Sequence, residues 1–459
     1  MNYRMRVATL YLLGFFIDLV NMFIANVAYP DIGRRFAAPV NLLAWVSNGY
    51  ILGLTLVIPL SRWLSQRIGS KRLLILSLIV FMAGTTGAGL ASSLSQLIAW
   101  RWLQGVGGGL LIPVGQTMTY ALYRSHERAK LSSAIMLVAL LAPALSPTLG
   151  GLIVDNVSWR YVFLASLPLA GVTLILAGLW LKPDVRLTLP EPLDFSGLIT
   201  ACSALTLILL GLTCLGDAGH IWQGTLLLVA GTLLTGGFIW HALRKATPLL
   251  NLRLLKAPLL QTAMLVYHFI PGVFTGVSLI AMIYLQAQPG MSATRVGAMM
   301  IPWALASFVA IMLTGKIFNH VGPRPLFILG CLGQGTGIAL LTLIGHVDGI
   351  FITALAYLLM GFGSSLCSST AQSSAFLDIP EDELADASAL WNINRQLSFC
   401  FGVAVMGLLL NLMLSTGLPT GQAFHLCFLI AAGSVIVPLL CCLRLPNRSL
   451  ILTLNKEKK

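Results

Sequence analysis

Long apolar runs, separated by short polar segments, make up almost the whole of the 459-residue chain. A run of about 20 apolar residues is what an α-helix needs to cross the hydrocarbon core of a bilayer. A backbone inside a bilayer must satisfy its own hydrogen bonds, so such runs are expected to be helical. The pattern predicts fourteen spanning helices, at residues 7–29, 41–61, 73–92, 96–121, 131–154, 159–181, 195–216, 222–243, 258–286, 292–315, 325–345, 349–373, 386–414 and 423–443.

The composition agrees with this prediction. Charged residues make up 9% of the chain and hydrophobic residues 57%, whereas about 25% of the residues of a soluble domain are charged. The first apolar run is too long for the hydrophobic region of a cleavable signal peptide. We therefore expect an all-α membrane protein that keeps its first span.

The basic residues alternate between the two sides of the predicted bundle. With both termini cytoplasmic, the inner segments hold 22 of the 28 Lys and Arg residues, and the outer loops hold only Arg34, Arg35, Arg160 and Arg295. An excess of basic residues marks cytoplasmic loops, whereas acidic residues carry little weight. The acidic inner segment 378–387 therefore does not oppose this orientation. Since topology accounts for the net charge of +13, we expect no nucleic-acid partner.

The sequence carries no motif for catalysis or for a metal site. Its eight cysteines lie almost entirely inside apolar runs and form no spaced ligand set with histidine. It also has neither a nucleophile elbow nor a P-loop. We expect a protein that is not an enzyme, that uses no cofactor or metal, and that is not driven directly by ATP.

Two inner loops repeat at an offset of 253 residues. Segment 61–72 aligns with segment 315–325, so that Gln66 matches Asn319, Arg67 matches His320, Gly69 matches Gly322 and Lys71 matches Arg324. Internal repeats are typical of alternating-access transporters, whose substrate site lies between the repeats. We expect six-helix halves at 1–182 and 258–445, a two-helix insert at 183–257 and a cytoplasmic tail at 446–459.

Asp18 is the only acid deep inside an apolar run. A carboxylate at that depth costs ~2.5–3.5 kcal/mol or more unless it is paired, hydrated or protonated, so it is a functional candidate. We interpret it as a proton carrier. Arg101, inside the fourth span, is its best partner, because a buried guanidinium must pair with an acid or bind backbone carbonyls. A purely structural tie between spans is the alternative role for Arg101.

Five motifs together resemble one family. They are LIAWRWLQGVGGG at 97–109, APALSPTLGG at 142–151, WRYVFLASLP at 159–168, Asp-Phe-Ser-Gly at 194–197 and ASALWNINRQLSFCFGVA at 387–404. In this order they resemble the major facilitator superfamily, and most closely its fourteen-helix drug/proton antiporter branch. The resemblance implies a monomer in the bacterial inner membrane that contacts lipid and exports small amphipathic molecules, cationic or neutral, in exchange for protons by alternating access.

Two other functions stay open. One is a dedicated exporter of a single metabolite or siderophore, with altered or absent proton coupling. The other is a sensor or scaffold that transports nothing. Transport of many drugs would favour the first interpretation, and one metabolite accumulating in a deletion strain would favour the dedicated exporter.

The chain departs from the family pattern in its first span. The branch carries D-x-T-x-x-N-x-A-L-P there, and Asn21 occupies the position of the acid, while Asn26 matches the family Asn. Asp18 lies three residues earlier, on the same helix face and about 4.5 Å away along the axis. We interpret it as the family carboxylate moved by one turn. A structural hydrogen-bonding role, with proton coupling changed or lost, is the alternative.

The predicted inner gate also departs from the family. Arg62 and Gln66 stand where the branch has Gly and Asp, and a neutral amide cannot replace the charge-assisted bond of that Asp. The resemblance therefore predicts a weaker or differently biased gate. Prolines in the fifth span offer a bend. The gating candidates are Arg62, Gln66, Arg67, Gly69, Lys71, Pro143, Pro147, Gly150, Gly151, Gly315, Asn319, Gly322 and Arg324.

Polar and aromatic residues inside the spans are the candidates for a substrate cavity. They are Asn21, Asn26, Gln104, Tyr267, His268, Trp303, Trp391, Asn394 and Arg395. For three of them a second role stays open. His268 can form an interhelical hydrogen bond, Trp303 can pack in the core, and Arg395 can bind either an anionic group or neighbouring backbone.

Overall fold

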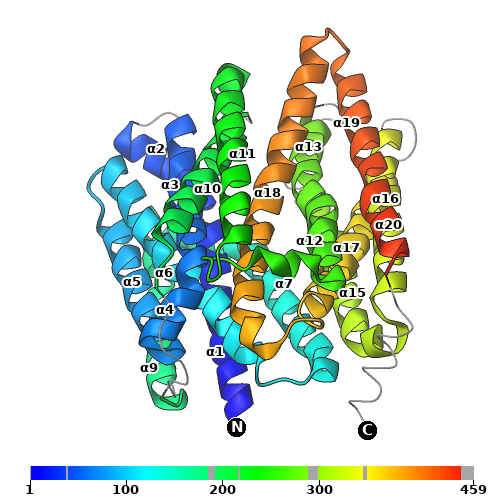
Figure 1. Ribbon diagram of the computed structural model, residues 1–459. Coiled ribbons are helices and arrows are strands. Elements are labelled where there is room, and N and C mark those ends of the chain that lie inside the picture. Colours follow the sequence, from blue (N-terminus) through cyan, green and yellow to red (C-terminus); the bar gives the residue numbers. More distant parts are fainter. Residues whose placement is uncertain are drawn as a thin grey trace.

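The computed structural model describes residues 2–37, 40–183, 192–215, 218–287, 298–344 and 349–445. These residues form an elongated bundle that is almost entirely helical (Figure 1). Two sequence predictions fall outside the described residues, namely the position of Arg295 and the tail at 446–459. The side chains of Asn26 and Pro147 are likewise not described.

The helices mostly follow the predicted runs, although the short helices at 29–36 and 61–68 occupy segments that the sequence predicts as loops. They are α1 (Tyr3–Ile24), α2 (Tyr29–Phe36), α3 (Val40–Val57), α4 (Ser61–Ile68), α5 (Ser70–Leu90), α6 (Leu94–Tyr120), α7 (Ser125–Asn156), α8 (Trp159–Leu164), α9 (Leu167–Trp180), α10 (Phe195–Leu215), α11 (Ile221–Arg244), α12 (Pro258–Tyr267), α13 (Val273–Ala287), α15 (Met300–Val321), α16 (Pro323–Leu340), α17 (Gly349–Ser374), α18 (Leu384–Ser415), α19 (Thr420–Ser434) and α20 (Ile436–Leu443).

Twelve helical segments of the described chain are long and apolar enough to cross a membrane. They are α1, α5, α7, α8 with α9, α10, α11, α12 with α13, α15, α16, α17, α18, and α19 with α20. Helices α3 and α6 lie where the sequence predicts the second and fourth spans, but they are not among the twelve. Polar residues such as Arg101, Gln104 and Gln116 lower the hydropathy of α6.

Some boundaries differ from the prediction. Helix α1 ends at Ile24, where a 3₁₀ turn follows, instead of continuing to residue 29. The predicted run 258–286 is interrupted by a π-helical turn at His268–Gly272, which contains Pro271. Pro lacks the N–H that an α-helix needs and clashes with the preceding turn, so the helix changes its hydrogen bonding at this point.

The helices form two groups. Helices α1–α9, the N-terminal group, pack largely against one another, with α1 against α6, α7 and α9. Helices α12–α20, the C-terminal group, do the same around α17 and α18. The α10–α11 hairpin stands in front of the two groups in Figure 1, and α10 contacts both α3 and α18.

Small residues allow the helices of the N-terminal group to approach closely. A Cβ atom added at Gly105 of α6 would lie 2.1 Å from the Tyr50 carbonyl oxygen of α3. One added at Gly107 would lie 2.3 Å from the Phe81 nitrogen of α5. Such contacts hold α6 between α3 and α5, and this packing fixes the position of the polar side chains that α6 carries.

The two repeated loops have the same backbone form. Gly69 ends α4 with φ 90°, and Gly322 ends α15 with φ 76°. Only glycine adopts such angles freely, which explains why both loops place a glycine there. In the first loop Lys71 donates hydrogen bonds to the Gly178 and Leu181 carbonyl oxygens, at 2.9 and 2.5 Å, at the end of α9.

Candidate functional site

Asp18 lies in the middle of α1 and is fully buried. Its Oδ1 atom accepts a hydrogen bond from the Tyr50 hydroxyl of α3. Its Oδ2 atom is buried without a hydrogen-bond partner. The backbone of α6 approaches closely, since a Cβ at Gly108 would lie 2.6 Å from Oδ1. A buried carboxyl oxygen without a partner is costly, so this group has unused capacity for a proton or a donor.

Arg101 is held mainly by backbone carbonyl groups. Its Nε donates to the Val46 carbonyl at 3.1 Å, and one Nη donates to the Asn21 carbonyl at 3.0 Å. The other Nη donates to the Gln104 side chain at 2.6 Å. These bonds satisfy the guanidinium within the N-terminal group.

The expected direct pairing of Asp18 with Arg101 is not among the contacts of the described residues. Instead, the Tyr50 ring lies between them, because the Arg101 guanidinium stacks on that ring at 4.3 Å from its centroid while the Tyr50 hydroxyl reaches Asp18. The charge of Arg101 still acts on Asp18. Tyr50 was not a sequence candidate, since only the three-dimensional packing brings it next to both residues.

Asn21, at the position of the family acid, belongs to a neutral network. Its Oδ1 accepts from Gln104 Nε2 at 2.9 Å, and its Nδ2 donates to the Ile17 carbonyl at 2.8 Å. Gln104 Nε2 also donates to Thr85 at 2.7 Å. Both amides are fully buried and bonded. They position α1 against α5 and α6.

Arg395 of α18 faces α1 from the C-terminal group. Its guanidinium stacks on the Phe15 ring at 4.9 Å from the centroid. The side chain is 5% exposed, and one Nη atom is buried without a hydrogen-bond partner. Phe15 precedes Asp18 by three residues, so it lies on the same face of α1. Arg395 therefore contacts α1 from the opposite group, at a residue about one helical turn from Asp18.

An aromatic cluster surrounds this point in the C-terminal group. The Tyr267 ring packs edge-on against Trp391 at 5.2 Å, and the Trp391 indole donates to Gln372 at 2.9 Å. His268 bonds Ser398 through Nδ1 at 2.8 Å. This contact joins the π-helical turn to α18, which agrees with the interhelical alternative for His268.

The remaining cavity candidates lie less close together. Asn394 donates to the Met264 carbonyl at 3.2 Å and so ties α18 to α12. Trp303 stacks on Phe274 at 5.6 Å and packs in a different apolar cluster from Tyr267 and Trp391.

A second polar site lies at one end of the bundle, which we call the gate end. It comprises the α6–α7 turn (121–124), the segment 375–383 before α18, and the ends of the helices that adjoin them (lower part of Figure 1). Arg128 donates to the Phe376 carbonyl at 2.6 Å, and Gln372 donates to the Tyr120 hydroxyl at 2.9 Å. These bonds join the N-terminal group to the C-terminal group.

The gate end also carries an ion pair between the groups. Arg62 of α4 lies 3.1 Å from Asp386 of α18. Arg62 is a departure from the family pattern, and Asp386 lies in the acidic segment 378–387, which says little about orientation. Together the two supply a charge-assisted contact that Gln66 alone cannot provide.

Two further bonds at the gate end involve residues that the sequence did not single out, and a third involves the gating candidate Asn319. Ser388 donates to Gln116 at 2.6 Å, and Asn392 donates to the same Gln116 oxygen at 2.8 Å. Asn319, from the second repeated loop, donates to the His126 carbonyl at 2.6 Å. Isolated Gln and Ser residues inside apolar runs were the available signal, but their partners lie about 200 to 280 residues away in the sequence.

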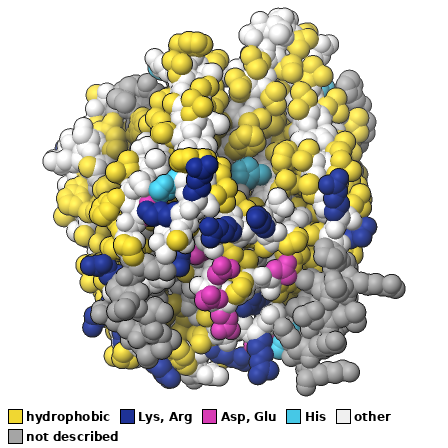
Figure 2. Space-filling view, in the orientation of Figure 1, with side chains coloured by type: hydrophobic (Ala, Val, Ile, Leu, Met, Phe, Trp, Pro, Cys, Tyr) yellow, Lys and Arg dark blue, Asp and Glu magenta, His cyan; other side chains and the backbone are white. Residues whose placement is uncertain are grey.

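Figure 2 shows how charge is distributed on one face of the molecule. The Lys, Arg, Asp and Glu side chains of this face lie in its middle and lower parts, and the upper part is mostly hydrophobic. The surface is hollowed between the upper ends of α11 and α18. An apolar groove of about 520 Å³ lies there, lined mainly by α11 and by Leu408 of α18.

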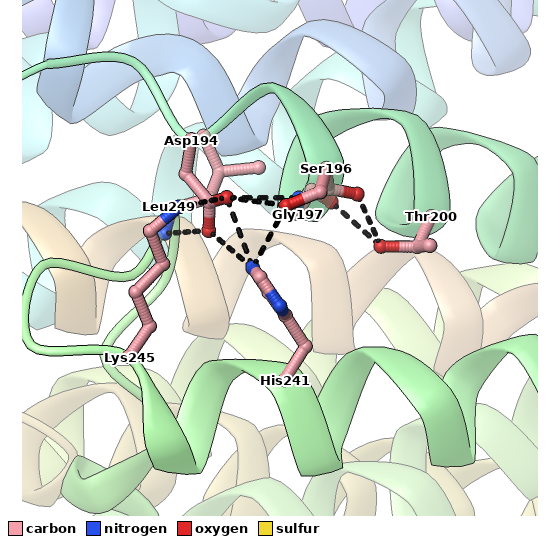
Figure 3. Close-up of polar contacts among 7 residues, drawn as sticks. All are labelled: Asp194, Ser196, Gly197, Thr200, His241, Lys245 and Leu249. Atoms are coloured by element: carbon pink, nitrogen blue, oxygen red, sulfur yellow. Dashed lines mark hydrogen bonds and ion pairs between the residues drawn. The ribbon is translucent and has the colours of Figure 1, made fainter.

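The hydrogen bonds of Asp194 form a third cluster, shown in Figure 3. Asp194 precedes α10 and is 2% exposed. It accepts bonds from Lys245 at 2.7 Å, from the Gly197 amide at 3.0 Å and from the Leu249 amide at 3.2 Å, and His241 Nε2 lies 3.0 Å away. Burial raises the pKa of Asp194, but these donors outweigh it and hold the pKa well below its usual range.

The sequence of this chain is similar to those of known proteins. A family model described as Major Facilitator Superfamily matches residues 11–403. The chain is 28% identical over 405 residues to the "Uncharacterized MFS-type transporter YhcA" of Bacillus subtilis, covering 86% of this chain and 74% of that protein. It is 27% identical over 449 residues to the "Putative multidrug resistance protein MdtD" of Klebsiella pneumoniae, covering 95% and 93%.

Solved structures show the same fold. The human organic anion transporter MFSD10 (TETRAN) superposes with a TM-score of 0.68 at 16% identity, over 96% of this chain and all of that chain. The proton:xylose symporter XylE superposes with a TM-score of 0.64 at 16% identity, over 95% of this chain and 94% of that one.

Proposed function

Because the chain belongs to the Major Facilitator Superfamily, whose members matched here are transporters and not enzymes, we propose that it exports small amphipathic molecules in exchange for protons. The buried acid Asp18, with one carboxyl oxygen lacking a hydrogen-bond partner, is the observation that carries the proton part. The relatives named for multidrug resistance support the substrate part.

The proposal includes a topology. We take α3 and α6 as spans in addition to the twelve, which gives fourteen, with residues 1–182 and 258–445 as halves and 183–257 as a two-helix insert. The gate end holds basic residues such as Arg4, Arg62, Lys71 and Arg128. By the positive-inside rule this end is cytoplasmic, in a bacterial inner membrane, together with both termini.

In this orientation the structure is closed toward the cytoplasm. The Arg62–Asp386 ion pair and the Arg128–Phe376 hydrogen bond hold the halves together at that end. Export then requires these contacts to break so that substrate enters from inside, and to re-form when it leaves outside. Asp18 takes up a proton while the outer side is open and releases it when the inner side opens.

The driving force can be sized from general values. One proton entering across 100 mV releases about 2.3 kcal/mol, and each pH unit adds about 1.4 kcal/mol. One proton per cycle therefore supports a substrate gradient of roughly ten- to a thousandfold.

The test compares Asp18→Asn with Asp31→Asn in proteoliposomes loaded with a pH-sensitive dye. Asp31 pairs with Arg34 away from Asp18, so its variant controls for loss of one carboxyl group. A panel of ethidium, tetraphenylphosphonium and neutral lipophilic drugs is added, and proton movement and drug uptake are recorded. We expect wild type and Asp31→Asn to couple the two, and Asp18→Asn to lose proton-driven transport. Normal coupled transport by Asp18→Asn would remove Asp18 from the mechanism.

A further inference from the structure

Two buried groups with unmet hydrogen-bonding capacity belong to opposite helix groups. One is the Oδ2 atom of Asp18 on α1, and the other is an Nη atom of Arg395 on α18. Both side chains are nearly or fully buried, at 0% and 5% exposure. The Phe15 ring, one turn from Asp18, stacks against the Arg395 guanidinium. A buried carboxyl group and a buried guanidinium with unmet hydrogen-bonding capacity are stabilised when they pair. We therefore expect the two to approach each other when the helix groups move.

The two cations near Asp18 are held very differently. Arg101 has three hydrogen bonds to the N-terminal group that also carries Asp18, so it moves together with Asp18. Arg395 belongs to the other group, and its described contact with α1 is the Phe15 ring. A rocking motion of the groups therefore changes the distance from Arg395 to Asp18 and leaves that from Arg101 almost unchanged.

We propose that Arg395 is the conformation-dependent counter-ion of Asp18, which approaches it in one state of the cycle and withdraws in the other. When Arg395 approaches, its charge favours the carboxylate, the O–H bond of Asp18 breaks and the proton passes to water. When Arg395 withdraws onto Phe15, the carboxyl group can take up a proton again. The proposal rests on the proton-carrier role proposed above for Asp18, and it makes Arg395 a positioning residue for that role.

The other ionisable groups around Asp18 do not change with conformation in this way. Among the described residues, Tyr50 of α3 and Arg101 of α6 are the other groups that act on Asp18, and both belong to the N-terminal group. Tyr11, on the same helix, and Tyr267 of α12 lie within the electrostatic reach of Arg395, and neither is among the groups that act on Asp18. Arg395 is therefore the charged group near Asp18 that domain motion can displace.

The test needs no substrate. Purified protein in lipid is titrated with acid while infrared difference spectra record the C=O band of a protonated carboxyl group, and Asp18→Asn identifies the part of the band that belongs to Asp18. Four further proteins are compared: wild type, Arg395→Gln, Arg395→Lys and Arg160→Gln. Arg160 donates to the Ala91 carbonyl in the N-terminal group, so its variant controls for removal of one positive charge elsewhere.

We expect the midpoint of the Asp18 band to move up by at least one pH unit in Arg395→Gln, a tenfold change in proton affinity. Arg395→Lys keeps the charge and is expected to move it less than half as far, and Arg160→Gln is expected to leave it within 0.3 unit. Arg395→Met serves as a second charge-removing variant if the Gln variant does not elute as a single folded species.

The outcomes separate this inference from the proposed function. A band that is lost in Asp18→Asn but keeps its wild-type midpoint in the folded charge-removing variant, Arg395→Gln or else Arg395→Met, overturns the counter-ion role and leaves the proton carrier standing. A shift of equal size in Arg160→Gln also overturns it. Absence of any titrating band from Asp18 overturns both proposals.

Discussion

Among the described residues, Tyr50 is the side chain that contacts both Asp18 and Arg101. Its hydroxyl donates to the acid, and its ring supports the guanidinium, so it transmits the position of one to the other. The sequence could not point to it, because a Tyr in an apolar run is common and 32 residues separate it from Asp18. The pattern of the first apolar run did identify the acid Asp18 and the nearby Asn21, because both lie on the same helix.

Tyr50→Phe is expected to alter the pH dependence of transport without unfolding the protein. The change removes the hydroxyl that donates to Asp18 and keeps the ring under Arg101. A hydrogen bond to a charged group contributes about 1.5–3 kcal/mol, which corresponds to roughly one to two pH units. Half-maximal proton-coupled uptake in proteoliposomes should therefore move to higher pH by about that amount.

A matched control is available in Tyr29→Phe. Tyr29 donates to Ser47 at 2.6 Å and makes no described bond to Asp18, so the same chemical change should leave the pH profile in place. A profile shifted equally in both variants would show that Tyr50 acts on Asp18 only through general packing.

At the scale of helices, the twelve candidate spans of the described residues lie largely in runs that were predictable, and their exact ends were not. Hydrophobic length decides where a helix crosses a membrane, but local turns decide where it stops, as at the 3₁₀ turn after Ile24 and the π-helical turn at His268–Gly272. The repeated loops were also predictable, since a positive φ at Gly69 and Gly322 requires glycine. Contacts between helices far apart in sequence, such as Arg62 with Asp386, were not.

The ion pair between α4 and α18 is expected to control the gate. Asp386→Asn leaves Arg62 without its counter-charge, which should favour opening of the gate end by about 1–3 kcal/mol. The distance between spin labels on 124 and 378 is expected to broaden toward longer values in the variant. Removing one partner tests the gate only if the fold survives, so a second variant is needed.

Exchanging the two charges provides that second variant. Arg62→Asp with Asp386→Arg restores an attractive pair in reverse, and the short distance should return toward that of the unchanged protein. If Asp386→Asn and the exchanged pair both give the wild-type distance distribution, the ion pair does not hold the gate closed.

At the scale of the whole molecule, the α10–α11 insert is tied to both halves. Its linkers meet α4 in a small recess lined by Arg62, Trp63 and Gln66 on one side and by residues 192–194 and 247–249 on the other. Asn251 donates to Glu383 at 3.1 Å, next to α18. The insert therefore contacts the region of the Arg62–Asp386 pair. The Asp194 cluster fixes the two ends of the insert to each other (Figure 3).

Asp194→Asn is expected to lower the melting temperature, and the size of the effect should depend on pH. The folded-state pKa of Asp194 lies well below its usual range. The stability that this depressed pKa provides is fully present above the unfolded value of about 3.9 and is lost as the pH falls through the folded value. Wild type should exceed the variant by about 1–3 kcal/mol of unfolding free energy between pH 5 and 8. The difference should shrink only below about pH 4.

Thermal unfolding in detergent measures this difference, with Asp155→Asn, an exposed acid, as the control. A difference that grows as the medium is acidified would contradict the assignment, because it would mean that the protonated form of Asp194 stabilises the insert.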